Sequence, residues 1–279
     1  MLELFPSRAI ALQIFGFGIH WYGLLYLLSF VVAIVLLPRL QTYRRLDLTR
    51  DQWLTIVSYC VLGVIAGGRL GYVFFYEPQY FVAHPLEILA VWQGGMSFHG
   101  GFLGVVLALW YSCKKLHIHP MVLADVVVVP AALGLALGRV GNFINQELYG
   151  TVTQLPWAIS VSGVDGLRHP TQIYAMLKDL TIALICFLYM RHARPVRPGR
   201  GFALFLMLYG VGRTLVEFLR EQQYALTELG PVSLTRGQTL SIPLFIAGVI
   251  LWCALRRSAL PGVSQASSRN AHGDSIMET

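Results

Sequence analysis

Long apolar stretches separated by short polar segments dominate the pattern of hydrophobic and polar positions along this 279-residue chain. A membrane-spanning helix needs about 20 mostly apolar residues. By that criterion the pattern predicts seven spans, near residues 17–37, 53–75, 95–113, 121–144, 171–190, 201–219 and 238–255. The expected fold is therefore all-α, a polytopic membrane protein with seven transmembrane helices.

The segments outside the predicted spans divide into an arm, two loops and a tail. Residues 77–94 mix apolar and aromatic positions and are too short to cross a bilayer, so we expect an interfacial or re-entrant arm. Residues 145–170 and 220–237 are rich in Gly, Thr, Pro and Ser and are expected to form outer loops. A single membrane domain over residues 1–257 then precedes a polar cytoplasmic tail, 258–279, expected to be disordered.

Composition and charge agree with a membrane location. The chain is 56% hydrophobic and 13% charged, whereas soluble domains carry about 25% charged residues. Its basic residues lie in short clusters between the apolar stretches, which argues against binding to nucleic acid. In membrane proteins the loops on the cytoplasmic side carry an excess of Lys and Arg. One side holds Arg39, Arg44, Arg45, Arg50, Lys114, Lys115, Arg191, Arg194, Arg197, Arg200, Arg256 and Arg257, and the other holds only Arg8, Arg168, Arg220 and Arg236. The N-terminus is thus predicted outside and the C-terminus in the cytoplasm.

Three arginines, Arg69, Arg139 and Arg213, fall inside predicted spans. Each costs about 2.5–3.5 kcal/mol at a helix centre on insertion scales. With the predicted orientation all three lie in the outer halves of their spans. The same level holds further polar residues, namely His20, Tyr22, Ser97, His99, Asn142 and Glu217. Five helices are therefore expected to direct polar groups to one level at the outer side.

A structural role is an alternative to a functional one for these charged residues. Arg69 can extend from a helix end to the headgroups, and Arg213 and Glu217 can form an i, i+4 ion pair. Lys178 and Asp179 lie nearer the membrane midplane, and the sequence assigns them no role. A guanidinium binds phosphate through paired hydrogen bonds and stays charged. The arginines therefore favour an anionic ligand, and a phospholipid suits a site within apolar helices better than a soluble anion.

Seven motifs carry a resemblance to a known family. They are HWYG (His20–Gly23), GGRLGYVFFY (Gly67–Tyr76), GGMSFHGG (Gly94–Gly101), GRVGNFINQELYG (Gly138–Gly150), RHPTQIY (Arg168–Tyr174), YGVGRTLVEFLR (Tyr209–Arg220) and GQTLSIP (Gly237–Pro243). Their order and spacing over almost the whole chain resemble those of bacterial prolipoprotein diacylglyceryl transferases. The resemblance implies a seven-helix enzyme of the bacterial inner membrane whose active site faces the periplasm.

The resemblance also implies a reaction. The family transfers the diacylglyceryl group of phosphatidylglycerol to the lipobox cysteine of a prolipoprotein signal peptide, which forms a thioether and releases glycerol 1-phosphate. This is the first step of bacterial lipoprotein maturation and is expected to need no cofactor and no metal. The thiol, with a pKa of about 8.5, must become a thiolate, and charge developing on the phosphate must be stabilised.

The motifs and the intramembrane charges together indicate the site residues. His99, Arg139 and Arg213 are expected to be catalytic, the arginines holding the phosphate and His99 serving as the first candidate for the base. Tyr209, Glu217 or the arginines themselves are alternatives for promoting the thiolate. The expected substrate-binding residues are Tyr22, Arg69, Asn142, Glu147, Gly150, Tyr209 and Glu217.

Two other function classes fit less well. A transporter would share the buried charges and broken helices but should show internal repeats and a polar path through the inner halves of the spans. A serine protease using Ser97 and His99 needs a base within hydrogen-bond reach of the nucleophile. On a helix, residues i and i+2 point apart, so this pair does not meet that requirement.

Overall fold

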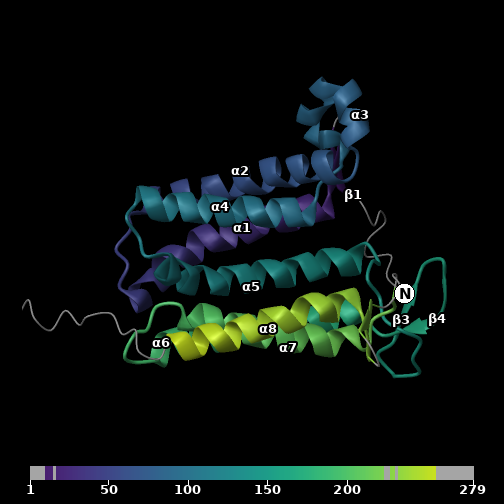
Figure 1. Cartoon of the computed structure of the whole chain (residues 1–279). Coiled ribbons are helices and arrows are strands. Elements are labelled where there is room, and N and C mark those ends of the chain that lie inside the picture. The colour runs from purple at the N-terminus through teal and green to yellow at the C-terminus, as the bar shows by residue number, and fades with distance from the viewer. Residues whose placement is uncertain (1–9, 15–16, 223–226, 230–231, 256–279) are drawn as a thin grey trace, which may run out of the picture.

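The computed structural model describes residues 10–14, 17–222, 227–229 and 232–255 of the chain (Figure 1). The predicted tail, 258–279, and the basic residues Arg8, Arg256 and Arg257 lie outside the described residues. The long helices are α1 (Trp21–Leu40), α2 (Arg50–Phe75), α4 (Phe98–Lys115), α5 (Pro120–Ile144), α6 (Thr171–His192), α7 (Arg200–Glu217) and α8 (Arg236–Ala254). A long helix thus occupies each position where the hydrophobic pattern predicts a span.

Five helices of the described part are long and apolar enough to cross a membrane: α1 with its continuation to Arg44, α2, α5, α6 and α8. The two shorter helices, α4 and α7, have 18 residues each. Helix α4 ends in two lysines, and α7 contains Arg200, Arg213 and Glu217. The protein is therefore a mostly helical, multi-pass membrane protein, with the strongest spanning signal in five helices.

The helices lie side by side in one bundle (Figure 1). Helix α2 packs against α4 and α7 packs against α8, while α5 contacts α1, α6 and α7 and so links the two groups. The starts of α1, α4, α6 and α8 and the ends of α2, α5 and α7 share one end of the bundle. This end, which we call the hairpin end, therefore carries most of the polar motifs.

Glycines allow α2 and α4 to approach closely. A Cβ atom on Gly63 would lie 2.5 Å from the carbonyl oxygen of Gly104, and one on Gly71 would lie 2.9 Å from the Cα atom of Gly100. Helices in membranes associate through such small residues because no hydrophobic force drives them together in lipid. Gly63 and Gly104, together with Gly71 and Gly100 of the GGRLGYVFFY and GGMSFHGG motifs, therefore set the α2–α4 contact.

Three antiparallel hairpins correct the all-α prediction. They are β1 (Ile10–Ile14) with β2 (Phe17–His20), β3 (Ile159–Val161) with β4 (Val164–Arg168), and β5 (Thr227–Leu229) with β6 (Val232–Leu234). The first predicted span began at residue 17, but Phe17–His20 is a strand and the helix begins at Trp21. Backbone pairing with residues 10–14 keeps this apolar segment extended, and such pairing is invisible to a count of apolar residues.

The predicted arm, 77–94, consists of one short helix, α3 (Pro78–Ala83), and two 3-10 turns, η2 (Pro85–Leu89) and η3 (Val91–Gln93). Prolines at the first positions of α3 and η2 suit these starts, because proline lacks the amide hydrogen that a first turn leaves unpaired. The arm stands out from the bundle beyond the end of α2 (Figure 1).

The opposite end of the bundle contains the main apolar core and one buried ion pair. Arg44, in η1 (Gln41–Arg44), lies 3.1 Å from Asp125 of α5 and donates to the carbonyl of Met190 at the end of α6. Asp125 also accepts hydrogen bonds from the amides of Gly199 and Phe202 at the start of α7. Buried apolar residues surround this end, among them Trp53, Ile56, Leu123, Val126 and Cys186. The Arg44–Asp125 pair therefore ties η1, α5, α6 and α7 together.

Candidate active site

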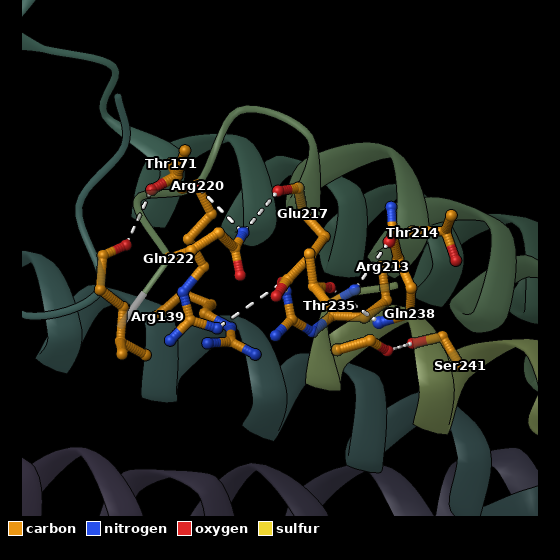
Figure 2. A network of polar contacts seen from close by, with 12 residues as sticks. Arg139, Thr171, Arg213, Thr214, Glu217, Arg220, Gln222, Thr235, Gln238 and Ser241 are labelled. Carbon is orange, nitrogen blue, oxygen red and sulfur yellow. Dashed lines mark hydrogen bonds and ion pairs between the residues drawn. The ribbon is translucent and has the colours of Figure 1, made fainter. Parts of the chain in front are cut away.

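A pocket at the hairpin end lies among α5, α6 and α7. Figure 2 shows polar side chains around it, among them Arg139, Arg213 and Arg220. Three guanidinium groups, those of Arg139, Arg213 and Arg220, line it. The other lining residues are Leu148, Thr171, Gln172, Ala175 and Val216. Because guanidinium groups bind phosphate and carboxylate through paired hydrogen bonds, this arginine pocket is suited to an anionic ligand.

Glu217 organises two of the three arginines. Its carboxylate forms an ion pair with Arg213, one turn earlier in α7, and lies 3.7 Å from the guanidinium of Arg220. A Cβ atom on Gly237 would lie 2.5 Å from its carboxyl carbon, so the first turn of α8 packs against this group. Thr235 caps that turn, and the positive end of a helix dipole favours a carboxylate. Since Glu217 is only 4% exposed, it orients the guanidinium groups from inside the protein.

A second polar network is centred on Asn142, beside Arg139. Arg139 donates a hydrogen bond to the Asn142 side-chain oxygen at 3.4 Å. The Asn142 amide nitrogen donates to the Tyr22 hydroxyl and, at 3.3 Å, to the Glu147 carboxylate. Tyr22 can approach because Gly141 has no side chain: a Cβ atom there would lie 3.3 Å from the tyrosine ring. Three predicted substrate-binding residues are thus linked to one predicted catalytic arginine.

Helix α6 fixes the loop that follows α5. The Thr171 hydroxyl donates to the carbonyl of Leu148 at 2.8 Å, and the Gln172 amide donates to the carbonyl of Glu147 at 2.7 Å. Gln146 and Leu148 have φ angles of 58° and 57°, in the left-handed region that costs roughly 1–2 kcal/mol for residues other than glycine. Hydrogen bonds from the start of α6 therefore hold Glu147 in place next to Asn142.

Gly150 meets a packing requirement at the same end. Its amide donates to the carbonyl of His169 at 2.9 Å, and it forms an isolated β-bridge with Arg220. A Cβ atom at Gly150 would lie 2.6 Å from the carbonyl oxygen of Leu219. The glycine therefore lets the loop after α5 pack against the residues after α7, which positions Arg220.

Arg69 lies outside the lining of the arginine pocket. It is 5% exposed, and its guanidinium donates hydrogen bonds to backbone carbonyls of the arm and of the residue that follows it. These carbonyls belong to Glu87, Ile88, Gly94 and Gly95, at distances of 2.5 to 3.2 Å. Arg69 thus fixes the arm to the end of α2, a role for which sequence reasoning offered no partner.

The arm also contains aromatic contacts of its own. The Tyr80 hydroxyl donates to the Glu87 carboxylate at 2.7 Å, and this hydrogen bond raises the pKa of Tyr80. The Tyr80 ring stacks on the His84 imidazole, with the ring centres 4.6 Å apart. Side-chain contacts therefore order the arm in addition to the hydrogen bonds from Arg69.

His99 and Tyr209 also lie outside the lining of the arginine pocket. His99 is in the first turn of α4, where its exposed imidazole meets the Phe98 ring edge-on, with the ring centres 5.7 Å apart. Tyr209 lies one turn before Arg213 in α7, and its ring stacks on that of Phe205. His99 lies at the hairpin end of α4, and Tyr209 lies one turn deeper in the bundle than Arg213.

Arg220 is the pocket residue that sequence reasoning missed. It was counted among the basic residues of the outer loops, whereas the structure places its guanidinium in the pocket lining. The spacing Arg213, Glu217, Arg220 follows i, i+4 and i+7, which puts all three on one face of a helix. That periodicity was the available signal. Thr171 and Gln172, within the RHPTQIY motif, were likewise present in the sequence but not singled out.

The site therefore offers charged and neutral hydrogen-bond donors around a small pocket, with carboxylates behind them. Over the residues that the structure describes, no group of three or more His, Cys, Asp or Glu side chains is arranged to hold a metal ion. Preorganised donors stabilise negative charge as it develops in a reaction. The arrangement can thus bind an anionic group, orient it and stabilise its charge.

Comparisons with known proteins cover most of the chain, including the residues of the site. A family model described as prolipoprotein diacylglyceryl transferase matches residues 9–254. Three relatives named phosphatidylglycerol–prolipoprotein diacylglyceryl transferase come from Polynucleobacter asymbioticus, Geobacter sulfurreducens and Nitrosospira multiformis. They are 45%, 47% and 42% identical to this chain, over 89%, 83% and 90% of its length and 95%, 89% and 88% of their own. The chain therefore belongs to the prolipoprotein diacylglyceryl transferase family.

Proposed function

We propose that this enzyme transfers the diacylglyceryl group of phosphatidylglycerol to the cysteine thiol of a prolipoprotein. The cysteine sulfur forms a bond to the glycerol carbon that carries the phosphate. The bond from that carbon to the phosphate oxygen breaks, and glycerol 1-phosphate leaves with its electrons. The thiol proton passes to a base, so the products are a thioether-linked lipid and a phosphate monoester.

One observation carries the assignment of the site: Arg139, Arg213 and Arg220 line a single pocket between membrane helices. Negative charge grows on the phosphate as the carbon–oxygen bond breaks, so guanidinium groups that contact it stabilise the transition state more than the ground state. Removing one such donor in other enzymes costs about 10² to 10³ in rate. Arg139 and Arg213 are proposed to be catalytic in this sense, with Arg220 as a third contact to the phosphate.

The Asn142 network is proposed to bind the glycerol part of the headgroup. Tyr22 and Asn142 combine a hydroxyl with an amide, and Glu147 adds an acceptor next to them. Such groups match hydroxyls, which both donate and accept hydrogen bonds. Phosphatidylglycerol carries a phosphate followed by free hydroxyls, so arginines next to an amide–carboxylate network suit its headgroup.

His99 is proposed to accept the thiol proton. It begins α4 at the hairpin end, and its exposed imidazole is open to a peptide that approaches from outside. An imidazole has an unperturbed pKa of about 6.5, which suits proton transfer near neutral pH. Gly100 and Gly101 next to it pack against α2, which fixes the start of α4 that carries His99. Tyr209 and Glu217 remain the alternatives, and Glu217 is already engaged by two arginines.

The proposed topology has seven spans, with the N-terminus and the arginine pocket on the periplasmic side of the inner membrane. Helix α7 counts as a span in this proposal because Arg213 lines the pocket and pairs with the buried Glu217. Helix α4 counts as a span because its two lysines lie in its last turn, where they can reach the headgroups. Residues 1–257 then form one membrane domain, followed by a cytoplasmic tail. The basic residues at the opposite end support this orientation.

The activity can be tested directly with purified protein in detergent or proteoliposomes. Incubation with phosphatidylglycerol and a peptide containing a lipobox cysteine should add the mass of a diacylglyceryl group to the peptide. Two controls match the mechanism: a Cys→Ser peptide lacks the nucleophile, and diacylglycerol lacks the leaving phosphate. A peptide that gains no mass with phosphatidylglycerol, or gains it equally with diacylglycerol, would contradict the proposal.

A further inference from the structure

One buried polar cluster lies directly beneath the arginine pocket and has no assigned role. On α6, the pocket-lining residue Ala175 is followed one turn deeper by Lys178 and Asp179. On α7, Arg213 is preceded one turn deeper by Tyr209. Helices α6 and α7 pack against each other. Lys178, Asp179 and Tyr209 therefore form a layer that we call the polar floor of the pocket.

The contacts within the polar floor are specific. The Lys178 ammonium lies 2.5 Å from the Asp179 carboxylate and 4.2 Å from the centre of the Tyr209 ring. Gly212 makes this possible, because a Cβ atom there would lie 2.7 Å from the Lys178 side chain. The side chain of Lys178 is thus guided along α7 to the face of the tyrosine ring.

The pair is deeply buried. Asp179 is fully buried, and the Lys178 side chain is 10% exposed. The Lys178 charge is close enough to interact with those of Arg139 and Arg213 in the pocket above. Replacing a buried ion pair by apolar residues is often neutral or stabilising, so stability alone gives weak reason for placing two charges here. A contact between ammonium and ring, in contrast, fixes the position of an aromatic side chain.

We propose that Lys178 is a positioning residue for Tyr209: its ammonium, anchored by Asp179, holds the tyrosine ring beneath the arginine pocket in the orientation that catalysis requires. This inference rests on the proposed function and adds residues that the family motifs did not single out. Tyr209 is one of the alternatives to His99 for promoting the thiolate, and Lys178 would act on the reaction only through it. Asp179 balances the lysine charge, so that the floor adds no repulsion to the cations above.

The first test is a cycle of variants assayed with phosphatidylglycerol and lipobox peptide. The variant Lys178→Met/Asp179→Asn removes both charges and so leaves no unpaired ion. We expect kcat/KM to fall about tenfold, the size expected for losing a desolvated cation–ring contact. In a Tyr209→Leu background the same double change should have no further effect, because its target is already gone. Lys178→Arg, which keeps a cation for the ring, should recover most of the activity.

A matched control exists at the other end of the bundle. The Lys115 ammonium lies 5.4 Å from the Tyr59 ring centre and 2.9 Å from the Tyr59 hydroxyl. Lys115→Met removes a similar lysine–tyrosine pair far from the arginine pocket and should leave kcat/KM unchanged. An equal loss of kcat/KM from Lys115→Met would show a general destabilisation and overturn the inference. The inference would also be overturned if the losses of kcat/KM from Lys178→Met/Asp179→Asn and from Tyr209→Leu multiplied in the combined variant.

A second measurement does not depend on activity. With 3-fluorotyrosine placed at position 209, the fluorine resonance should shift on going from the wild type to the Lys178→Met/Asp179→Asn variant, and Lys178→Arg should retain most of the original position. An unchanged resonance would overturn the inference. If the resonance shifts between the wild type and the variant while the wild type lacks transferase activity, the contact between Lys178 and Tyr209 stands and the proposed function is rejected. The two failures are therefore distinguishable.

Discussion

Two arginine sites at the same end of the bundle show how differently a membrane protein uses guanidinium groups. Arg69, at the end of α2, directs its hydrogen bonds to four backbone carbonyls of residues 87–95. In the arginine pocket, Arg139 has one long hydrogen bond, to the Asn142 side chain, among the described residues, and Arg213 is held by a carboxylate. A guanidinium that gives most of its donors to backbone carbonyls holds structure, whereas one held from a single side keeps more donors for a ligand.

The difference follows from the cost of burying a charge. An arginine within a membrane helix is expensive unless its donors are satisfied. At Arg69 four backbone carbonyls of residues 87–95 meet most of that cost within the protein. In the pocket Glu217 offsets part of it, while three arginines share that carboxylate and the more distant Glu147. The pocket thus keeps an excess of positive charge, which an anionic headgroup can neutralise.

Replacing Arg139 should have the largest effect on activity. Arg139→Ala is expected to lower kcat by on the order of 10² to 10³, because one charge-stabilising donor is lost from the transition state. Arg139→Lys keeps the charge but lacks the paired donors of a guanidinium, so its activity should lie between those of the wild type and the alanine variant. Mass spectrometry of the lipidated peptide measures both rates.

The result would separate binding from catalysis. A rise in KM for phosphatidylglycerol with unchanged kcat would mean that Arg139 binds ground and transition states equally. An unchanged kcat/KM in Arg139→Ala would remove the arginine pocket as the site of phosphate binding. Thermal unfolding of each variant in detergent identifies any loss that comes from unfolding.

Replacing Arg69 should have a smaller effect on activity and a larger one on the arm. Arg69→Met removes the donors that hold the four carbonyls, so residues 77–94 should become more sensitive to protease. We expect the transfer rate to fall by less than about tenfold, since a residue that does not line the pocket contributes no transition-state donor. Arg69→Lys, with one ammonium, should give intermediate protease sensitivity. A loss of activity as large as that of Arg139→Ala would place Arg69 among the substrate-binding residues after all.

The sequence predicted the helices well because their signal is local. Apolar stretches of adequate length located all seven. The hairpin of residues 10–14 with Phe17–His20 was missed because strand pairing depends on a partner outside the window of apolar residues. There an extended segment was taken for the first turn of a helix.

The site was predictable in part for the same reason. Arg139 and Asn142 lie three residues apart, so a helix places them on one face, and they are in contact. The partners of Arg69 lie 18 to 26 residues away along the chain, and no periodicity reveals them. Arg220 lies just past a helix end, where a basic residue can be either part of an outer loop or part of a pocket lining. Only the packing of the loop at Gly150 distinguishes these roles.

Arg44 provides the third and smallest effect on activity, and it completes the comparison. Its guanidinium is buried like that of Arg69, but it contacts Asp125 at the end of the bundle opposite the pocket. Arg44→Met should lower the free energy of unfolding by about 3–5 kcal/mol, the usual cost of leaving one partner of a buried ion pair unpaired.

Because Arg44 lies far from the arginine pocket, the folded fraction of this variant should transfer lipid with wild-type KM and kcat. Thermal unfolding and steady-state kinetics on the same preparation check both expectations. A stability loss without a kinetic change would assign Arg44 to the scaffold, with Arg69 between it and Arg139. A changed KM for phosphatidylglycerol would instead mean that the two ends of the bundle are coupled. In that case a buried arginine could not be classified from its own contacts alone.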